Sequence, residues 1–452
     1  MDGRNIGKRW AAGLTALLWT TLAMQAQTDT TAFMRQLLQA PHVTGVEACD
    51  GGGVYKEKYV VRMTQDVNGH DTLDGTFSER VVVGLKGPDR PTVMVTEGYF
   101  AHYALNPLYE EELSRLLDAN VVVCEHRYFA ESVPQTHSGG SPSDEGWDYW
   151  QWMTVDNSMA DLHRVRQSLG TVFGGKWVAT GISKGGQTTM FYRATYPDDV
   201  DVSVSYVAPL NRRVEDGRHE PFLDHKVGTA VARLAVRQAQ CELLWRKERL
   251  LPGFDSFSRQ KGYTYNLPVA DIYDYCVLEL PFAFWQWGTP VSTIPQTEAA
   301  DSTWLDYLTT VAGPDYFTCP SAFTPFHVQA ARELGYYGYS RKGLRRLLGV
   351  KRTKGYLKQI MLPQQLRGIK FDKTLYKRTV KFLKTHDPKH IFIYGEYDPW
   401  SASGVADWLD CSRKQNMRVY VQPGGSHATR ISTMPDDMKT EILSRLTDWL
   451  EK

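Results

Sequence analysis

The sequence carries almost no excess of charge of either sign, because its 452 residues include 52 lysines and arginines against 51 aspartates and glutamates. A protein that binds nucleic acid usually presents a strongly basic face, so this balance argues against a nucleic-acid partner. The six cysteines are widely spaced and include no Cys-x-x-Cys pair, which indicates neither a zinc site nor a redox motif. The composition, with 42% hydrophobic and 23% charged residues, is that of an ordinary globular protein.

Beyond the first 26 residues, the sequence has no uncharged apolar run of the roughly 20 residues that cross a bilayer, so no stable membrane span is expected. At the start of the chain, Arg4 and Arg9 flank a basic segment that precedes the apolar run Trp10–Met24, and small residues follow as far as Ala26. This arrangement is typical of a secretory signal peptide. We therefore expect residues 1–26 to direct export, with the mature protein in a periplasm, at the cell surface or secreted.

Apolar strand-like runs alternate with helical patterns between about residues 54 and 210. The predicted strands are 59–63, 80–85, 92–96, 120–125, 176–180 and 201–207, and the predicted helices are 110–117, 158–169 and 185–194. The pairs Asn68-Gly69 and Asp74-Gly75 predict turns between the first two strands. Strands separated by helices indicate an α/β fold with a mostly parallel sheet that is covered on both faces.

The pattern changes between residues 211 and 385, where helical stretches and aromatic residues dominate and alternating strand runs are few. We interpret this region as an inserted, mainly helical lid domain. The strand and helix rhythm then resumes, with strands at 390–394 and 417–421 and helices at Gly404–Cys411 and Asp436–Leu450. The predicted domains are a signal peptide at 1–26, the first part of the core at 27–210, the lid at 211–385 and the second part of the core at 386–452.

The strongest local signal is the run Gly181-Ile182-Ser183-Lys184-Gly185-Gly186, which lies between a predicted strand and a predicted helix. Gly-x-Ser-x-Gly in that context is the nucleophile elbow of the α/β-hydrolases, in which the serine projects from a sharp turn above the sheet. The glycines leave room where the strand and the helix crowd together. We therefore predict an α/β-hydrolase core with Ser183 as the nucleophile. The alternative is a glycine-rich turn with an ordinary serine.

A serine hydroxyl needs an adjacent base, and this fold supplies its acid and its histidine from later strands, in the chain order Ser, Asp, His. Asp398 follows the predicted strand 390–394, and His427 ends a glycine-rich loop after the strand 417–421. We expect Asp398 to orient His427, the general base, and we keep Glu396 as the rival acid. The alternatives are a turn aspartate and a loop histidine without a catalytic role.

An oxyanion hole requires backbone N–H groups that face the substrate carbonyl. Lys184, the residue after the nucleophile, supplies one, and Gly98 or Tyr99, in the loop after an earlier strand, is expected to supply the second. The same edge of the sheet carries the run Glu125-His126-Arg127-Tyr128-Phe129. This run is either a local salt-bridge network that fixes its loop or, with Glu97, a source of a carboxylate for a charged group of the substrate.

Five segments carry a family resemblance. They are Glu97-Gly98-Tyr99, Glu125-His126-Arg127-Tyr128-Phe129, Gly181-Ile182-Ser183-Lys184-Gly185-Gly186, Gly395-Glu396-Tyr397-Asp398-Pro399-Trp400 and Gly425-Ser426-His427. Together they resemble the secreted bacterial tripeptidyl aminopeptidases, which are serine peptidases related to the prolyl carboxypeptidase and dipeptidyl peptidase group. The resemblance spans about residues 45–450, and its motifs are confined to the α/β part.

The resemblance implies a peptide substrate from whose free N-terminus short fragments are removed, often with proline before the cleaved bond. An aminopeptidase must hold an α-ammonium group, for which Glu97 and Glu125 are the candidate carboxylates. Four lid aromatic residues either form a proline pocket or belong to the lid core: Phe282, Phe284, Trp285 and Trp287. The alternatives are a lipase or esterase of the same fold and an exported non-catalytic binding protein. A serine triad needs neither metal nor cofactor, and the oligomeric state stays open.

Overall fold

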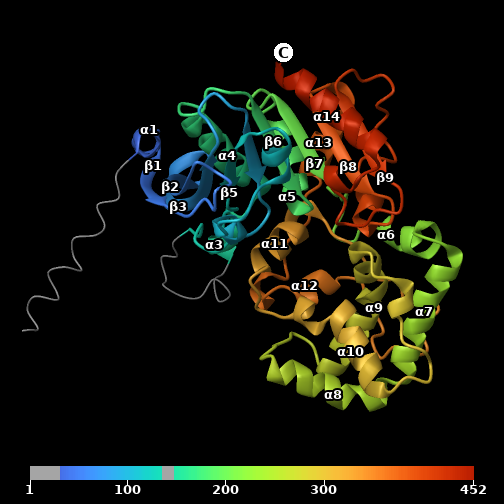
Figure 1. Cartoon of the computed structure of the whole chain (residues 1–452). Helices are drawn as coiled ribbons and strands as arrows, with labels where there is room; N and C mark the ends of the chain where they lie inside the picture. Colours follow the sequence, from blue (N-terminus) through green and yellow to red (C-terminus); the bar gives the residue numbers. More distant parts are fainter. Residues whose placement is uncertain (1–30, 135–146, 452) are drawn as a thin grey trace, which may run out of the picture.

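The structure is a computed structural model that describes residues 31–134 and 147–451 (Figure 1). The predicted signal peptide, residues 1–26, lies outside the described residues. Nine strands of the described part form one sheet in the order β1-β2-β3-β5-β4-β6-β7-β8-β9. The strands are β1 Val43–Ala48, β2 Glu57–Asn68, β3 Asp71–Leu85, β4 Thr92–Thr96, β5 Asn120–Cys124, β6 Trp177–Ile182, β7 Val202–Tyr206, β8 His390–Gly395 and β9 Met417–Gln422.

The sheet is antiparallel at one edge and parallel elsewhere. β2 pairs antiparallel with both β1 and β3, and β3 pairs antiparallel with β5. From β5 through β4, β6, β7 and β8 to β9, every pairing is parallel. β4, β5 and β7 are buried along their whole length, as is typical of parallel strands covered on both faces. The prediction of an α/β fold with a mostly parallel sheet is confirmed.

Helices cover both faces of the sheet. Alternate side chains of a strand point to opposite faces, so the apolar residues of the buried strands need a covering layer on each side. The helices in contact with the sheet are α1 Ala32–Gln39, α2 Glu112–Leu116, α4 Val155–Leu169, α5 Lys184–Thr195 and α14 Asp436–Glu451. Two further helices outside the lid are α3 Trp147–Trp150 and α13 Thr374–Thr385. Met94 and Ala179 are buried in the cluster that includes α4 and α5. Their strand neighbours Val93 and Val178 are buried in a second cluster, which includes α2 and α14. The sheet is therefore the middle of three layers.

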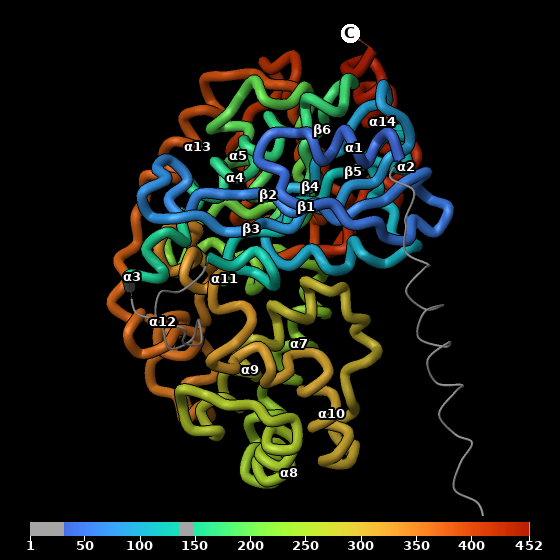
Figure 2. The backbone as a smooth tube through the Cα atoms, turned by 90° about the vertical axis from the view of Figure 1, so that its left-hand side faces the viewer, coloured from blue at the N-terminus to red at the C-terminus, as the bar shows by residue number. Residues whose placement is uncertain are grey.

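The chain between β7 and β8, residues 207–389, forms helices and loops without a strand. Its helices before α13 are α6 His219–Pro221, α7 Ala230–Trp245, α8 Lys247–Gln260, α9 Val269–Trp287, α10 Asp301–Val311, α11 Thr324–Gln329 and α12 Tyr356–Ile360. Figures 1 and 2 show α7 to α12 gathered into one body below the sheet, and we call this body the lid. α13 instead packs against α5. The domain boundaries at residues 210 and 385 stay predictions.

Short 3-10 or π helices complete the described part. They are η1 His102–Leu105, η2 Phe222–Lys226, η3 Val291–Thr293, η4 Pro314–Phe317, η5 Ala330–Leu334, η6 Gln364–Leu366, η7 Pro399–Ser403 and η8 Ile431–Thr433. Among the described residues, none of the helices combines the length and the apolar character that crossing a bilayer requires.

Two predicted local structures are wrong. Asp74 and Gly75 lie inside β3, where the pairing with β2 shifts register, and Gly75 takes up the irregularity with a φ of 90°. The predicted helix Gly404–Cys411 is a series of turns. Side chains satisfy part of its backbone: the Val405 N–H donates to the Tyr394 hydroxyl at 3.1 Å, and Trp408 Nε1 donates to the Gly404 carbonyl at 3.0 Å.

Candidate active site

Ser183 lies at the sharp turn between β6 and α5, with φ 57° and ψ −119°. A residue other than glycine rarely adopts a positive φ, so the surrounding structure must hold this strained conformation. The tight packing explains the flanking glycines: a Cβ on Gly181 would lie 2.4 Å from the Gly185 backbone, and one on Gly186 would lie 2.5 Å from the Tyr206 carbonyl oxygen. The serine is thereby held at the end of a parallel strand, beside the N-terminus of a helix.

His427 and Asp398 contact each other at the same edge of the sheet. The distance from His427 Nδ1 to Asp398 Oδ2 is 2.7 Å, and both side chains are buried. The second carboxylate oxygen of Asp398 accepts the N–H of Trp400 at 3.1 Å. Glu396 is exposed and accepts the N–H of Gly424 at 2.7 Å, so it holds the glycine-rich loop rather than the imidazole. The geometry therefore pairs the histidine with Asp398.

The loop that carries His427 is also tied to the lid. The backbone N–H of His427 donates to the carbonyl of Gln286 at 2.9 Å, near the C-terminal end of α9. The ring of Trp287, the last residue of α9, lies edge-on to the imidazole with 5.9 Å between ring centroids. The imidazole is therefore positioned by the lid as well as by the core.

Ser183 and His427 open onto one cavity of about 890 Å³ between the core and the lid. Core residues that line it include Glu97, Tyr99, Ile182, Trp400 and Arg430, and lid residues include Glu279, Trp287, Tyr316, Phe323, Tyr336 and Tyr337. A mostly apolar cavity with a few convergent polar groups is the usual form of a ligand site. The structure thus brings the predicted nucleophile and base to a space that can hold a substrate.

The predicted oxyanion region is assembled around Lys184, the first residue of α5. Gly98 packs so closely that a Cβ on it would lie 2.6 Å from Lys184 Cγ. The N–H of Gly98 donates to Glu97 Oε2 at 3.0 Å, so this donor is engaged in the structure. The ammonium of Lys184 donates to the Gly98 carbonyl and lies 5.2 Å from the ring centroid of Tyr99. Burial lowers the pKa of Lys184 well below its usual value.

Glu97 is half-buried and lines the cavity. Its Oε1 accepts the hydroxyl of Tyr103 at 2.5 Å, while its Oε2 accepts the N–H of Gly98. Burial raises the pKa of Glu97, and these donors and the charge of Lys184 act in the opposite direction. The Glu97 carboxylate therefore already has hydrogen-bond donors and a nearby cation.

Glu125 does not line this cavity, and its prediction as a substrate anchor is wrong. Its side chain is fully buried and forms an ion pair with Arg80 of β3. Its oxygens also accept the N–H of Ala101 at 3.1 Å, the N–H of Glu131 at 3.1 Å and the hydroxyl of Ser132 at 3.0 Å. With its oxygens occupied inside the protein, Glu125 fixes the loops around it.

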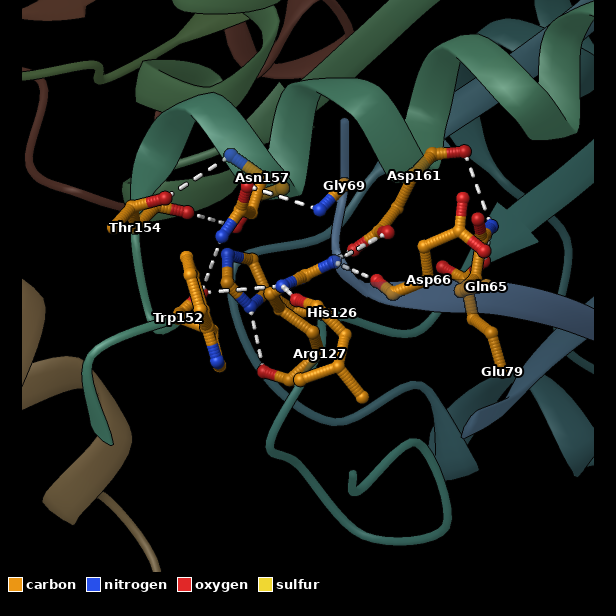
Figure 3. Close-up of polar contacts among 12 residues, drawn as sticks. Gln65, Asp66, Gly69, Glu79, His126, Arg127, Trp152, Thr154, Asn157 and Asp161 are labelled. Carbon is orange, nitrogen blue, oxygen red and sulfur yellow. Dashed lines mark hydrogen bonds and ion pairs between the residues drawn. The ribbon is translucent and has the colours of Figure 1, made fainter. Parts of the chain in front are cut away.

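Arg127, from the same run, is the centre of a buried network (Figure 3). Its guanidinium holds Asp161 of α4 by two contacts, Nε to Oδ2 at 2.6 Å and Nη2 to Oδ1 at 2.7 Å. It also donates to the carbonyls of Asp66 at 3.0 Å, Val67 at 2.8 Å and Trp152 at 3.1 Å. The interpretation of the run as a local salt-bridge network is confirmed. Sequence reasoning missed Asp161, which lies on α4 beside the buried polar residues Asn157 and Ser158.

Three of the four aromatic residues proposed for a proline pocket belong to the lid core: Phe282, Phe284 and Trp285 are buried among other side chains. Only Trp287 lines the cavity. The aromatic lining comes mainly from residues that sequence reasoning did not assign to the pocket: Tyr99, Phe100, Phe323, Phe326, Tyr336, Tyr337 and Trp400. Among the described residues, no group of His, Cys, Asp and Glu side chains is arranged to hold a metal ion.

A strained serine at a strand-to-helix turn and a histidine paired with an aspartate, both at the carboxyl ends of parallel strands, define a serine hydrolase of the α/β-hydrolase fold. Comparison with protein families identifies the class of serine hydrolase. The chain belongs to the family described as PS-10 peptidase S37, whose sequence model matches residues 28–451. The protein is therefore a serine peptidase, and its substrate is a peptide.

Individual relatives agree with this family. Over 402 residues the chain is 29% identical to the prolyl tri/tetrapeptidyl aminopeptidase of Streptomyces mobaraensis. The matched region covers 86% of this chain and 79% of that protein. A shorter match to the lysosomal Pro-X carboxypeptidase of Mus musculus is 24% identical over 208 residues and covers 44% of this chain and 41% of that protein. The predicted resemblance to the tripeptidyl aminopeptidases is confirmed.

Among solved structures, the proline iminopeptidase of Mycobacterium smegmatis is 12% identical, with a TM-score of 0.37, over 86% of this chain and 98% of that one. A likeness at this level concerns the fold alone.

Proposed function

We propose that the protein is an exported aminopeptidase that releases short fragments, of tripeptide size, from the free N-termini of peptides, with a preference for proline before the cleaved bond. The observation that carries the proposal is that Ser183 and His427, which is paired with Asp398, line one cavity between the core and the lid. The name of the Streptomyces relative, at 29% identity, supports the fragment size and the proline preference. Export rests on the signal-like sequence of residues 1–26.

In the proposed reaction, His427 takes the proton of Ser183 as its hydroxyl oxygen attacks the peptide carbonyl. Asp398 accepts the Nδ1–H of the imidazole, which leaves Nε2 as the base, and stabilises the imidazolium that forms. His427 then gives the proton to the leaving amine. Water hydrolyses the acyl-enzyme on Ser183 with the same histidine as base, and the N-terminal fragment leaves as a free acid.

The oxyanion of the tetrahedral intermediate would lie at the N-terminus of α5, where the N–H of Lys184 is one donor. The loop of Gly98 and Tyr99 would supply the second donor, since it lies directly against Lys184. For the Gly98 N–H to serve, its hydrogen bond to Glu97 has to be exchanged for one to the substrate. Aromatic rings on both sides of the cavity offer the flat apolar surface that a proline ring requires.

Three substrates of one peptide sequence test the proposal: a tripeptide nitroanilide that ends in proline, its N-acetylated form, and a short acyl ester. We expect rapid release of nitroaniline from the free peptide and slow release from the blocked one. Equal rates for both peptides, or activity confined to the ester, would reject the aminopeptidase. Mass spectrometry of the products of longer unblocked peptides measures the fragment size.

A further inference from the structure

One carboxylate of the cavity lies in the lid and was not selected from the sequence. Glu279 belongs to α9, between the buried residues Leu278 and Leu280, and its own side chain is 5% exposed. It lines the cavity that also contains Ser183 and His427. A buried glutamate needs a reason, since acidic residues are almost never fully buried unless they are paired.

The partners of Glu279 are tyrosine hydroxyls. Tyr337 donates to both carboxylate oxygens, at 3.0 Å each, and Tyr339 donates to Oε2 at 2.6 Å. Tyr316 continues this cluster through a 2.6 Å contact between its hydroxyl and that of Tyr337. The groups that act on the carboxyl are burial and these hydroxyls, and no cation of the described residues is among them. The lid thus holds the Glu279 carboxyl in place without a partner cation among those residues.

A second buried acid of the same helix has a cation and backbone donors as partners. Asp274 is fully buried too, but its Oδ1 accepts the ammonium of Lys247 at 2.6 Å. Its Oδ2 accepts the N–H groups of Gly349 at 2.7 Å and Val350 at 3.0 Å. Asp274 is therefore satisfied within the lid. Glu279 faces a cavity instead, and a buried carboxylate without a cation is energetically unfavourable.

Glu97, a half-buried carboxylate of the same cavity, also differs from Glu279, because it lies near Lys184 and accepts one N–H and one O–H donor. A cation that enters with the substrate therefore gains more at Glu279 than at Glu97. A peptide brings one such cation in every sequence, its α-ammonium group, which has three N–H donors. The two hydroxyls on Glu279 leave lone pairs for them.

We propose that Glu279, held by Tyr337 and Tyr339, binds the α-ammonium group of the peptide and so determines where the free N-terminus lies. This inference rests on the proposed aminopeptidase function. Glu279 lies on a long buried helix, so the site is rigid with respect to the lid. The distance between Glu279 and Ser183 then sets how many residues fit between the terminus and the cleaved bond, at roughly 3.3 Å per extended residue.

The test is the ratio of kcat/KM for the free peptide nitroanilide to kcat/KM for its N-acetylated form. For Glu279→Gln, which keeps the shape and removes the charge, we expect kcat/KM for the free peptide to fall on the order of 100-fold, the scale of losing one partner of a buried charge pair. The ratio should then approach one. Asp306→Asn removes an exposed carboxylate from the neighbouring helix α10, and it should keep the wild-type ratio.

The outcomes separate the two proposals. A wild-type ratio near one would reject the aminopeptidase and, with it, the role of Glu279. A large wild-type ratio that persists in Glu279→Gln would reject only the role of Glu279. Labelling with a fluorophosphonate shows whether each variant is folded, because it requires an assembled triad. If Glu279→Gln does not fold, Tyr339→Phe removes one hydroxyl and keeps the carboxylate. A partial fall of the ratio supports the proposal, and an unchanged ratio overturns it.

Discussion

The carboxylates on the core side of the cavity and the one on its lid side have different interaction partners. On the core side, Asp398 contacts the imidazole of His427 at 2.7 Å, and Glu97 lies near the charge of Lys184. On the lid side, Glu279 meets only tyrosine hydroxyls. A carboxylate that already has a charged partner orients a base or fixes a loop before any substrate binds. A carboxylate without such a partner is available to bind a cation of the substrate. The core therefore carries the chemistry and the lid carries the selection of the substrate.

The largest expected effect comes from removing the nucleophile, which should abolish catalysis without abolishing substrate binding. Ser183→Ala removes the nucleophile and should lower turnover roughly a millionfold, the scale of losing a member of a serine triad. The variant should still bind an unblocked tripeptide, because Glu279 and the aromatic lining are intact. Nitroanilide hydrolysis measures the first quantity and calorimetry the second. Near-normal turnover would reject Ser183 as the nucleophile.

The next effect concerns the core network alone. Arg127→Met leaves Asp161 buried without its cation, so we expect a loss of about 3–5 kcal/mol in the free energy of unfolding, measured by chemical denaturation. The ratio of free to blocked peptide should stay at its wild-type value in the folded variant. Arg378→Met is the matched control, because it breaks an exposed pair with Asp156 and should cost at most about 1 kcal/mol. Equal losses in the two variants would contradict the assignment of Arg127 as a buried structural residue.

The smallest expected effect is a pH dependence of the lid site. Burial raises the pKa of Glu279 to about 8, against the hydroxyls of Tyr339 and Tyr337. In the free enzyme the carboxyl is therefore protonated below about pH 8, and it must lose that proton to bind an ammonium group. Free α-ammonium groups have a pKa of about 7.7–8.0, so above pH 8 the substrate loses its charge. The ratio of free to blocked peptide should then peak near pH 8 and fall up to tenfold per pH unit on either side.

The neighbours of Glu279 do not titrate across this peak. The titratable groups that interact with Glu279 are Tyr316 of η4, Tyr336, Tyr337 and Tyr339 after η5, Tyr356 of α12 and Cys276 of α9. Burial raises the pKa of each of these groups. A ratio that is flat with pH in the wild type would contradict the role of Glu279.

Sequence reasoning placed the core side well, because its signals are local. Gly181 and Gly185 surround Ser183 at a spacing that only a tight strand-to-helix turn demands, and Asp398 and His427 each follow a clear apolar strand. Glu125 was misassigned because its partner is distant along the chain. Arg80 lies on β3, which pairs with β5 although β4 comes between them in sequence. Nothing in a one-dimensional pattern pairs those two strands.

The lid side was beyond prediction for a different reason. Short helices and loops of the lid supply most of the aromatic side chains that line the cavity, among them Tyr316, Phe323, Tyr336 and Tyr337. Such segments have no hydrophobic periodicity from which the direction of a side chain could be predicted. The one available signal was Glu279, an isolated acid within the apolar stretch of α9. An acid in such a place indicates either a buried ion pair, as at Asp274, or a ligand site, and only coordinates separate the two.

The hydrogen bond from the His427 backbone to Gln286 links the base to the helix that carries Glu279. The exposed side chains of Ile182, Trp287 and Phe323 line the same cavity. A rotation of the lid that broke the hydrogen bond would also displace the imidazole, so we expect catalysis to require that the lid stays against the core.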